Sequence, residues 1–386
     1  MDDRISTLTD DLLCRILSFL PTEQAVATSI LSKRWKPIWI SVPVLDFDNQ
    51  THLRKGKPSY SFERLIYATI QARDPQQSIK TFRLKYELLD LELSEERANA
   101  DINVWIKTAI NHGVENLEIY LDCNSVPFDY IVRLTCCGIF SCKTLVVLKL
   151  KEVSLAASGS VELPSLKCLW LLRVEFEEPQ YLMELLYGCP ELEDLKTIFL
   201  DYAHGGSFCK ERFKILPKLV RADIRSSGME IMDGNSTSIL MKAISNVEFM
   251  NITEFRVNDS VPEFPHLRHL TLSLISTVKS SNLMLLMLKN CPKVQSFELF
   301  GSFKDDDVLH YPHFVPECLT SCLTKCYLKR FEGTENDLQF AKYIMQNSTY
   351  LQSMKILSLS PDPLEVLKEL AMYPRKSASC ELSFDR

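Results

Sequence analysis

Apolar residues recur along most of the chain in one short pattern, in which an apolar residue is followed by two others, three and five positions later. Leu145, Leu148 and Leu150 form a typical triplet. The pattern begins at Ile79, Val114, Leu145, Leu166, Leu192, Leu219, Val247, Leu267, Val294, Leu323 and Leu351. Because the apolar positions at each start alternate, each start predicts a short strand with a buried face.

The regular spacing of these strands predicts a repeat array. The starts lie about 27 residues apart on average, within the window of about 20–29 residues for leucine-rich repeats. Helices are predicted in longer intervals, at 181–186 and 283–286, whereas the intervals that enter Leu166 and Leu267 are too short for a full helix. Since each unit leaves an apolar face that only its neighbours cover, the array is predicted to fold as one curved solenoid.

The first fifty residues follow a helical pattern instead. Five large aliphatic residues lie on one stripe of a predicted helix: Leu12, Leu13, Ile16, Leu17 and Leu20. Thr9 is placed to cap this helix and Pro21 to end it. Two shorter helices are predicted at 22–30 and around 32–35. So short a segment cannot bury all its apolar side chains, so it either packs on the rest of the chain or presents an apolar face to a partner.

The remaining segments carry weaker patterns. Residues 49–58 are polar and basic and predict a linker, and apolar residues between 62 and 70 predict a helix packed against the first strand. The charged run 304–307 predicts a loop. The section after it is predicted to contain two further repeat units and then a closing helix and strand.

Composition narrows the classes of function. Lys and Arg total 44 against 50 Asp and Glu, a net charge of −6 that disfavours a general electrostatic grip on nucleic acid or anionic membranes. Only 11 glycines are present, and no glycine-rich phosphate-binding motif occurs. No apolar run approaches the ~20 residues that cross a bilayer. The acidic start is unlike a signal peptide, so we expect a cytoplasmic or nuclear protein whose 13 cysteines stay reduced.

Clustered cysteines and histidines do not form a recognisable reactive pattern. Cys318, Cys322 and Cys326 are spaced by four, whereas zinc sites favour closer pairs or matching histidines. His266 and His269 would point to opposite faces of a strand. No nucleophile–base arrangement can be recognised from spacing. The sequence therefore predicts no catalytic residue, no metal and no cofactor.

Residues 5–35 resemble a plant F-box. The resemblance is carried by Ile5-Ser6-x-Leu8-x-Asp10-Asp11-Leu12-Leu13-x-x-Ile16-Leu17-Ser18-Phe19-Leu20-Pro21-Thr22 and by Ala25-Val26-Ala27-Thr28-Ser29-x-Leu31-Ser32-Lys33-Arg34-Trp35. In that family the module docks on the SKP-type adaptor of cullin-RING ubiquitin ligases, mostly through hydrophobic side chains. The chain departs from the family at Thr9, where the usual residue is a proline that preorganises the helix start.

The family motif and the apolar stripe together imply a set of adaptor-binding residues. They are Leu8, Leu12, Leu13, Ile16, Leu17, Leu20 and Pro21 around the first helix, and Leu31, Ser32, Arg34 and Trp35 around the third.

The last section resembles the FBD domain of plant F-box proteins. The motifs are Val315-Pro316-Glu317-Cys318-Leu319, Glu332-Gly333-Thr334-Glu335, and Leu367-x-Glu369-Leu370 with Pro374-Arg375-x-Ser377-Ala378-x-Cys380-x-Leu382-x-Phe384. The predicted organisation is an α/β chain: a three-helix F-box at 1–48, a linker and helix at 49–75, a curved leucine-rich-repeat solenoid at 76–303 and an FBD cap at 312–386. From the residues alone, the last segment is a terminal cap or a partner-binding surface.

These resemblances imply a receptor rather than an enzyme. The F-box would hold the SKP-type adaptor and, through it, a cullin, while the repeats would hold an unidentified target protein near the ubiquitin carrier. The predicted function is substrate recognition in an SCF-type ubiquitin ligase, with neither nucleic acid nor membrane as a partner. Two alternatives stay open: a leucine-rich-repeat scaffold that recruits no ligase, and a small-molecule co-receptor.

Overall fold

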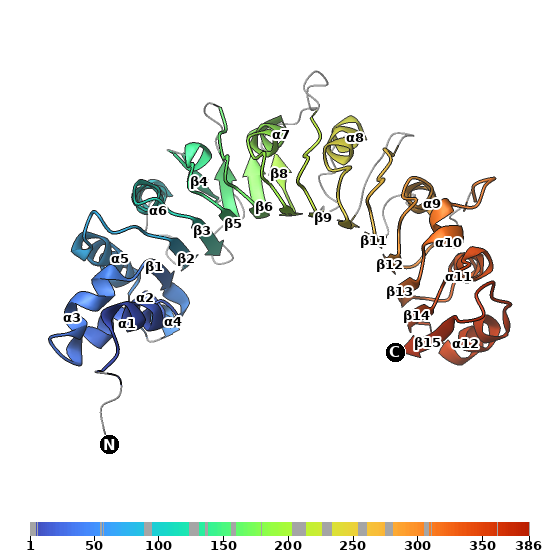
Figure 1. Cartoon of the computed structure of the whole chain (residues 1–386), viewed down its shortest axis with the longest axis horizontal. Coiled ribbons are helices and arrows are strands. Elements are labelled where there is room, and N and C mark those ends of the chain that lie inside the picture. Colours follow the sequence, from blue (N-terminus) through green and yellow to red (C-terminus); the bar gives the residue numbers. More distant parts are fainter. Residues whose placement is uncertain are drawn as a thin grey trace. The chain divides into compact units, whose positions relative to one another are not determined.

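The computed structural model shows a mixed α/β protein built on parallel strands (Figure 1). It describes residues 5, 7–54, 56, 58–88, 95–122, 131–135, 138–155, 160–178, 180–202, 214–225, 234–253, 261–274, 281–304, 309, 311–360 and 362–385. The chain divides into two compact units. The first contains residues 1–192 with 201–204, and the second contains residues 193–200 with 205–386.

The first unit begins with a helical module. Its elements are α1 (Asp10–Leu17), α2 (Thr22–Ala27), the 3-10 turn η1 (Thr28–Ile30), α3 (Trp35–Ile38) and the 3-10 turn η2 (Trp39–Ser41). These short helices enclose a small apolar core of their own, formed by Leu13, Leu17, Ala25, Trp35, Ile38 and Val42. The first helix ends at Leu17, earlier than the predicted stop at Pro21, because the chain tightens into turns in which the Phe19 and Leu20 amides donate to the Ile16 and Leu17 carbonyls.

The strands of the first unit form a parallel sheet in the order β1-β2-β3-β5-β6. They are β1 (Val44–Asp48), β2 (Thr81–Glu87), β3 (Asn116–Asp122), β5 (Val147–Leu155) and β6 (Cys168–Phe176); β4 (Val132–Leu134) pairs with β5, and β8 (Asp201–Tyr202) with β6. The connecting elements are α4 (Asn49–Arg54), α5 (Ser59–Ala72), α6 (Glu95–Asn111), η3 (Ile139–Ser141) and α7 (Gln180–Tyr187). Figure 1 shows α5 and α6 on one side of the strands, so the other side stays open.

The second unit repeats this plan with a parallel sheet in the order β7-β9-β10-β11-β12-β13-β14-β15. Its strands are β7 (Asp194–Ile198), β9 (Arg221–Arg225), β10 (Phe249–Thr253), β11 (His269–Ser273), β12 (Ser296–Phe300), β13 (Lys325–Phe331), β14 (Ser353–Ser358) and β15 (Glu381–Asp385). Its helices are α8 (Gly234–Ala243), α9 (Ser281–Lys289), α10 (Glu317–Ser321), α11 (Glu335–Asn347) and α12 (Pro363–Met372).

All eleven strands predicted from the apolar pattern are present. In each, the two alternating positions of the pattern are buried, as Leu148 and Leu150 are in β5, and the residue between them lies on the open face; Thr197 of β7 is the one polar residue at these positions. The predicted helices at 181–186, 283–286 and 62–70 correspond to α7, α9 and α5. No helix is described within the parts of the short intervals before β6 and β11 that the structure covers. Burial of one side of every strand therefore fixes the repeat register.

Two elements near the start of the sheet differ from prediction. Val42, Leu45 and Phe47 follow the same apolar pattern, and the last two lie in β1, a strand that was not predicted. The predicted linker at 49–58 is wrong in its first half, which is helix α4. A tertiary contact explains the helix, since the side-chain amide of Asn49 donates to the Glu87 carbonyl at 2.8 Å and accepts from the Glu87 amide at 2.8 Å.

The closing helix and strand predicted for the last section are α12 and β15. The Glu332–Glu335 motif forms the start of α11, where Thr334 and Asp337 make a reciprocal capping box. The buried Asp337 carboxylate also accepts from the Phe303 amide at 2.9 Å, so Asp337 ties the start of α11 to the segment after β12. Near the end of the chain, the Ser377 hydroxyl donates to the Leu351 carbonyl at 2.6 Å. The predicted loop at 304–307 lies mostly outside the described residues.

Candidate partner-binding sites

Helix α1 presents three different faces. One face is buried, because Leu13 and Leu17 are fully covered by the core of the module. A second face lines a groove of about 510 Å³, which Asp10, Cys14 and residues of α3 and η2 border. The third face carries Leu12 and Ile16, both exposed. A helix of 3.6 residues per turn places these three sets on separate sides, so the apolar stripe is split between core and surface.

The exposed side of the module is unusually apolar. Six large hydrophobic side chains within the first 31 residues are between 45% and 85% exposed: Ile5, Leu12, Ile16, Phe19, Ile30 and Leu31. Leu12, Ile16 and Phe19 are spaced by four and three residues, which sets them along one side of α1 and the turn that follows it. Large exposed apolar groups of this kind mark sites that bind another protein.

The structure separates the residues predicted to bind the adaptor into two groups. Leu13, Leu17 and Trp35 lie in the core of the module, and Leu8 and Leu20 are partly buried against it. Leu12, Ile16, Pro21, Leu31 and Ser32 are exposed, and Arg34 is intermediate. The first group forms or borders the core of the module, whereas the side chains of the second group are open to solvent wholly or in part.

Arg34 joins the segment after η1 to the start of α1. Its guanidinium donates to the Leu8 carbonyl and forms an ion pair with Asp10, with 2.7 Å between Nη2 and Oδ1. Thr9 occupies the N-cap position, but its side chain makes no capping hydrogen bond, in contrast to the prediction. The start of the helix is therefore held from outside by Arg34.

Two contacts join the helical module to the sheet. The backbone amide of Asp46 in β1 donates to the Thr22 hydroxyl at the start of α2, at 2.7 Å. Arg73, at the end of α5, donates to the Val42 carbonyl at 2.5 Å. Because Thr22 takes up an amide on the free edge of β1, the module closes this edge of the sheet.

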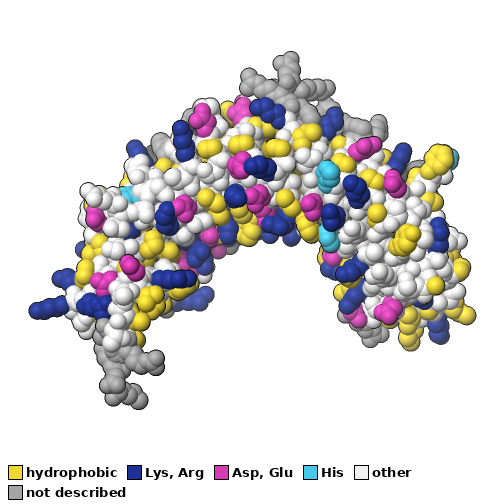
Figure 2. Space-filling model, in the orientation of Figure 1, with side chains coloured by type: hydrophobic (Ala, Val, Ile, Leu, Met, Phe, Trp, Pro, Cys, Tyr) yellow, Lys and Arg dark blue, Asp and Glu magenta, His cyan; other side chains and the backbone are white. Residues whose placement is uncertain are grey.

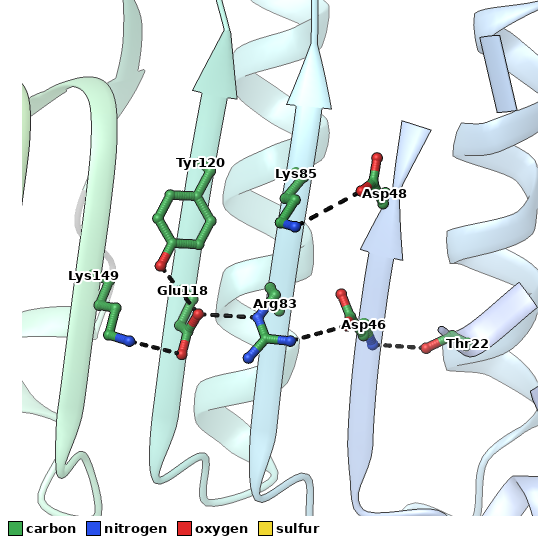
Figure 3. Close-up of polar contacts among 8 residues, drawn as sticks. All are labelled: Thr22, Asp46, Asp48, Arg83, Lys85, Glu118, Tyr120 and Lys149. Atoms are coloured by element: carbon green, nitrogen blue, oxygen red, sulfur yellow. Dashed lines mark hydrogen bonds and ion pairs between the residues drawn. The ribbon is translucent and has the colours of Figure 1, made fainter. Parts of the chain in front are cut away.

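A row of alternating charges crosses the open face of the first unit, formed by the residues between the two buried positions of each strand (Figure 3). Arg83 of β2 lies 3.0 Å from the Asp46 carboxylate on one side and 3.0 Å from the Glu118 carboxylate on the other. Lys149 of β5 approaches Glu118 at 3.3 Å and lies over the Trp170 ring of β6, 4.2 Å from its centre. We call this row the charge ladder: Asp46, Arg83, Glu118, Lys149 and Trp170.

Glu118 is the centre of the charge ladder. Burial alone would raise the pKa of its carboxyl group, but the hydrogen bond and charge of Arg83, assisted by Lys149 and Tyr120, hold the pKa below its ordinary value. The Tyr120 hydroxyl donates to Glu118 at 3.1 Å, and burial together with this carboxylate raises the pKa of Tyr120. Every charge of the ladder thus has an opposite charge beside it.

Aromatic and basic side chains lie on the open face of the second unit. The rings of Phe249 in β10 and His269 in β11 are stacked, with centroids 4.5 Å apart and planes 3° apart. Both side chains are exposed. Figure 2 shows histidine and basic side chains gathered in this part of the unit. Aromatic and arginine residues are the types that dominate protein interfaces, so this face is a second candidate binding surface.

Sequence reasoning did not single out the open-face residues. Lys149, Asp46 and His269 each lie next to a buried apolar position of a strand. The alternation therefore predicts that their side chains lie on the open face of the sheet. Their partners lie on a neighbouring strand, from 20 residues away for Phe249 and His269 to 37 residues away for Asp46 and Arg83. These pairs could have been found by aligning the repeats and comparing the open-face residues of neighbouring strands, because residues at the same position of adjacent strands lie side by side.

The cysteines act as packing residues. Cys142, Cys189 and Cys291 are buried at one repeat position, as expected for small hydrophobic side chains. Burial raises the pKa of the Cys189 thiol to about 12, so it stays protonated. No group of three or more His, Cys, Asp or Glu side chains within the described ranges is placed to hold a metal ion. Among the same residues, no helix is both long and apolar enough to cross a membrane.

A helical module with an exposed apolar side, followed by parallel repeats with a polar open face, defines a repeat protein built for binding. Comparison with known proteins supports this class. Residues 5–47 match the F-box domain, residues 102–208 match the leucine-rich repeats of FBD-associated F-box protein At5g56370, and residues 311–356 match FBD.

Relatives in Arabidopsis thaliana align over nearly the whole chain. F-box/FBD/LRR-repeat protein At4g26340 is 28% identical over 99% of this chain and 100% of its own. FBD-associated F-box protein At4g10400 is 30% identical over 99% of this chain and 100% of its own, and FBD-associated F-box protein At5g38590 is 30% identical over 92% and 94%. The chain belongs to this family of F-box proteins with leucine-rich repeats and an FBD domain. Its F-box implies the ubiquitin conjugation pathway.

Proposed function

We propose that this protein is the substrate-recognition subunit of an SCF-type ubiquitin ligase. In this proposal the three-helix F-box, residues 1–48, docks on a SKP-type adaptor and through it on a cullin. The repeats hold a target protein, and the FBD segment, residues 312–386, caps the array. The protein performs no chemistry itself and raises the local concentration of its target near the ubiquitin carrier.

The exposed apolar side of the helical module carries this proposal. The module keeps Leu13 and Leu17 for its own core and still leaves Leu12, Ile16 and Phe19 in water. Burying apolar surface contributes about 25 cal/mol per Å², so covering these side chains with an adaptor helix would stabilise a complex. Contacts from Pro21, Leu31 and Ser32 would extend the same surface.

The compartment follows from the proposed partners. Adaptor and cullin act in the cytosol and nucleus, where thiols stay reduced. The nine cysteines among the described residues are free thiols, and six of them are buried: Cys142, Cys189, Cys291, Cys318, Cys326 and Cys380. We therefore place the protein in the cytoplasm, the nucleus or both.

A charge placed on the exposed side of α1 tests the proposal. Ile16→Asp puts a carboxylate into the proposed contact, and we expect adaptor affinity to fall by at least about 100-fold, because an unpaired charge would be buried there. Ile16 is 45% exposed in the free chain, so the variant should keep its thermal melting temperature. Titration calorimetry with purified SKP-type adaptor measures the affinity.

Ile215→Asp is the matched control. Ile215 lies in the second unit, its side chain is 47% exposed, and the substitution introduces the same carboxylate. It should bind the adaptor as the unchanged protein does. Equal affinity for Ile16→Asp and Ile215→Asp would reject the docking surface. If the unchanged protein bound no adaptor at all, the chain would act instead as a repeat scaffold that recruits no ligase.

A further inference from the structure

The ring pair Phe249 and His269 forms a flat apolar platform at the start of β10 and β11. The two residues are direct neighbours in the parallel register, and their rings are stacked face to face. Phe249 is 37% exposed, although it stands on a strand whose core positions, Met250 and Ile252, are fully occupied by apolar side chains. The platform therefore serves no packing role that its strand requires, and it is open to a ligand.

Two cations lie near this platform, Arg268 next to His269 in the chain and Lys325 two strands away in the same register row, with Ser296 of β12 between. Arg268 precedes β11 and lies 3.7 Å from Glu248, with both side chains about half exposed. Lys325 begins β13, on the strand beyond β12, and is exposed. Burial, Lys325 and Arg268, in that order, lower the pKa of His269, and Glu248 opposes them only in part. Burial and the two positive charges therefore both disfavour protonation of the His269 ring.

Two other cations on the same face have close carboxylate partners. Arg221 lies 3.1 Å from Asp194, and Lys329 lies 2.6 Å from Glu298. Within the described residues no ion pair is found for Lys325. The charges of the charge ladder in the first unit also have opposite charges beside them. Lys325 and the loosely paired Arg268 are therefore a place where a negatively charged group of a partner would be favoured.

We propose that Phe249, His269, Arg268 and Lys325 form a docking site for an acidic segment of the target protein. An aspartate or glutamate of that segment would pair with Lys325 and Arg268, and an adjacent aromatic or aliphatic side chain would pack on the ring pair. This inference rests on the proposed function, because it names the chemistry of the target that the receptor selects. We call the four residues the acidic-segment site.

Occupation of the acidic-segment site has a consequence for protonation. A carboxylate beside Lys325 and Arg268 offsets their field, so the pKa of His269 must rise when the segment binds. Binding then takes up a proton, and affinity increases as the pH falls towards the pKa of the free histidine. Phe249 stacks on the protonated ring at least as well as on the neutral one.

Selection from a random dodecapeptide phage library against the full-length protein tests the site. We expect the selected sequences to place an acidic residue next to an aromatic or aliphatic one. A synthetic peptide of that sequence should lose affinity on the order of tenfold or more with Lys325→Glu, where like charges meet, and with Phe249→Ala, which removes the platform. Lys289→Glu, the same change at the exposed end of α9, is the matched control and should leave affinity unchanged.

The pH dependence gives an independent readout. The peptide should bind the unchanged protein more tightly at pH 5.5 than at pH 7.5, whereas the affinity of His269→Gln should be nearly flat. Selected sequences without acidic enrichment, or equal losses with Lys325→Glu and Lys289→Glu, would overturn the proposal. Adaptor titration of the same variants separates the two proposals, because all of them should bind the adaptor normally even if the acidic-segment site is wrong.

Discussion

Left-handed backbone conformations recur at a single position of the repeats, directly after the open-face residues of a strand. Glu152, Arg173, Phe199 and Arg330 have φ between 50° and 56°, and Gly301 has φ 125° at the equivalent position. Such a conformation costs a residue with a Cβ atom about 1–2 kcal/mol. Five repeats thus have a residue with positive φ at the same position, and one of them uses glycine there.

Replacement of this glycine should be costly for two separate reasons. A Cβ atom at Gly301 would lie 2.5 Å from the Leu274 carbonyl oxygen, and the φ of 125° is unfavourable for any L side chain. We expect Gly301→Ala to lower the free energy of unfolding by more than about 2 kcal/mol. Denaturant unfolding followed by circular dichroism measures the change.

Gly113→Ala separates the two causes. Gly113 also has positive φ, 72°, but no atom lies within 4 Å of its added Cβ. This variant should lose only about 1 kcal/mol, the cost of the conformation alone. If both variants lost the same free energy, the close approach of the Leu274 carbonyl would have no energetic weight.

At the scale of elements, the start of α1 offers room for stabilisation. Thr9 has φ −69°, close to the value that proline requires, and its side chain makes no capping hydrogen bond. Thr9→Pro should therefore raise the free energy of unfolding of the helical module by about 0.4–1 kcal/mol, chiefly by restricting the unfolded chain. The thermal melting temperature of the chain reports the gain, and a lower melting temperature would show that the segment before Thr9 cannot accept proline.

The charge ladder makes the first unit sensitive to acid. The folded protein holds the pKa of Glu118 below its ordinary value, so the ionised carboxylate stabilises the fold at pH values above the pKa of the unfolded chain, about 4.3. That stabilisation disappears as the pH falls through the lower pKa of the folded state. Unfolding free energies should therefore fall from pH 5 towards pH 3.

Glu118→Gln checks the source of this dependence. The variant leaves Arg83 and Lys149 without their shared carboxylate, so it should be less stable at pH 7 by about 1–3 kcal/mol. Its stability should also change less between pH 5 and pH 3 than that of the unchanged protein. Parallel curves for the two proteins over that range would assign the acid sensitivity to other carboxylates.

Elements were predictable to the extent that burial determines them. The triplet at Leu267, Leu270 and Leu272 located β11 because each apolar side chain must enter the core. Helix α4 escaped prediction because its position depends on the hydrogen bonds of Asn49 with a strand 38 residues away. The local pattern of apolar residues shows which side chains are buried, but it does not show hydrogen bonds to strands far away in the sequence.

The candidate sites were predictable only in part, for the same reason. Leu12 with Ile16 and Leu13 with Leu17 have the same spacing, so the helix period alone cannot say which pair faces the core. The neighbours Ile38 and Val42 decide it by covering Leu13 and Leu17. Lys325 could not be recognised either, because the sequence does not show that cations such as Arg221 and Lys329 have carboxylate partners on neighbouring strands.

At the scale of the whole molecule, the helical module and the first strands act as one body. They fall within the same compact unit and share the contacts of Thr22 with Asp46 and of Arg73 with Val42. An adaptor held by the module would therefore be fixed in orientation relative to β1 through β6. Target groups bound on that part of the sheet would be presented to the ubiquitin carrier in a defined direction.

The uncovered side chains of the module bear on how the protein survives before it meets its adaptor. Phe19, Ile30 and Leu31 are each more than 60% exposed. Chaperones and the degradation machinery bind exposed apolar surface of this kind. We expect co-expression with a SKP-type adaptor to increase the recovered monomeric yield and to lower the binding of the dye ANS. A yield that is the same with and without the adaptor would contradict this. If the prediction holds, the supply of adaptor sets how much of this protein a cell can keep. Copies without an adaptor would be removed before they could bind targets without passing them to a ligase.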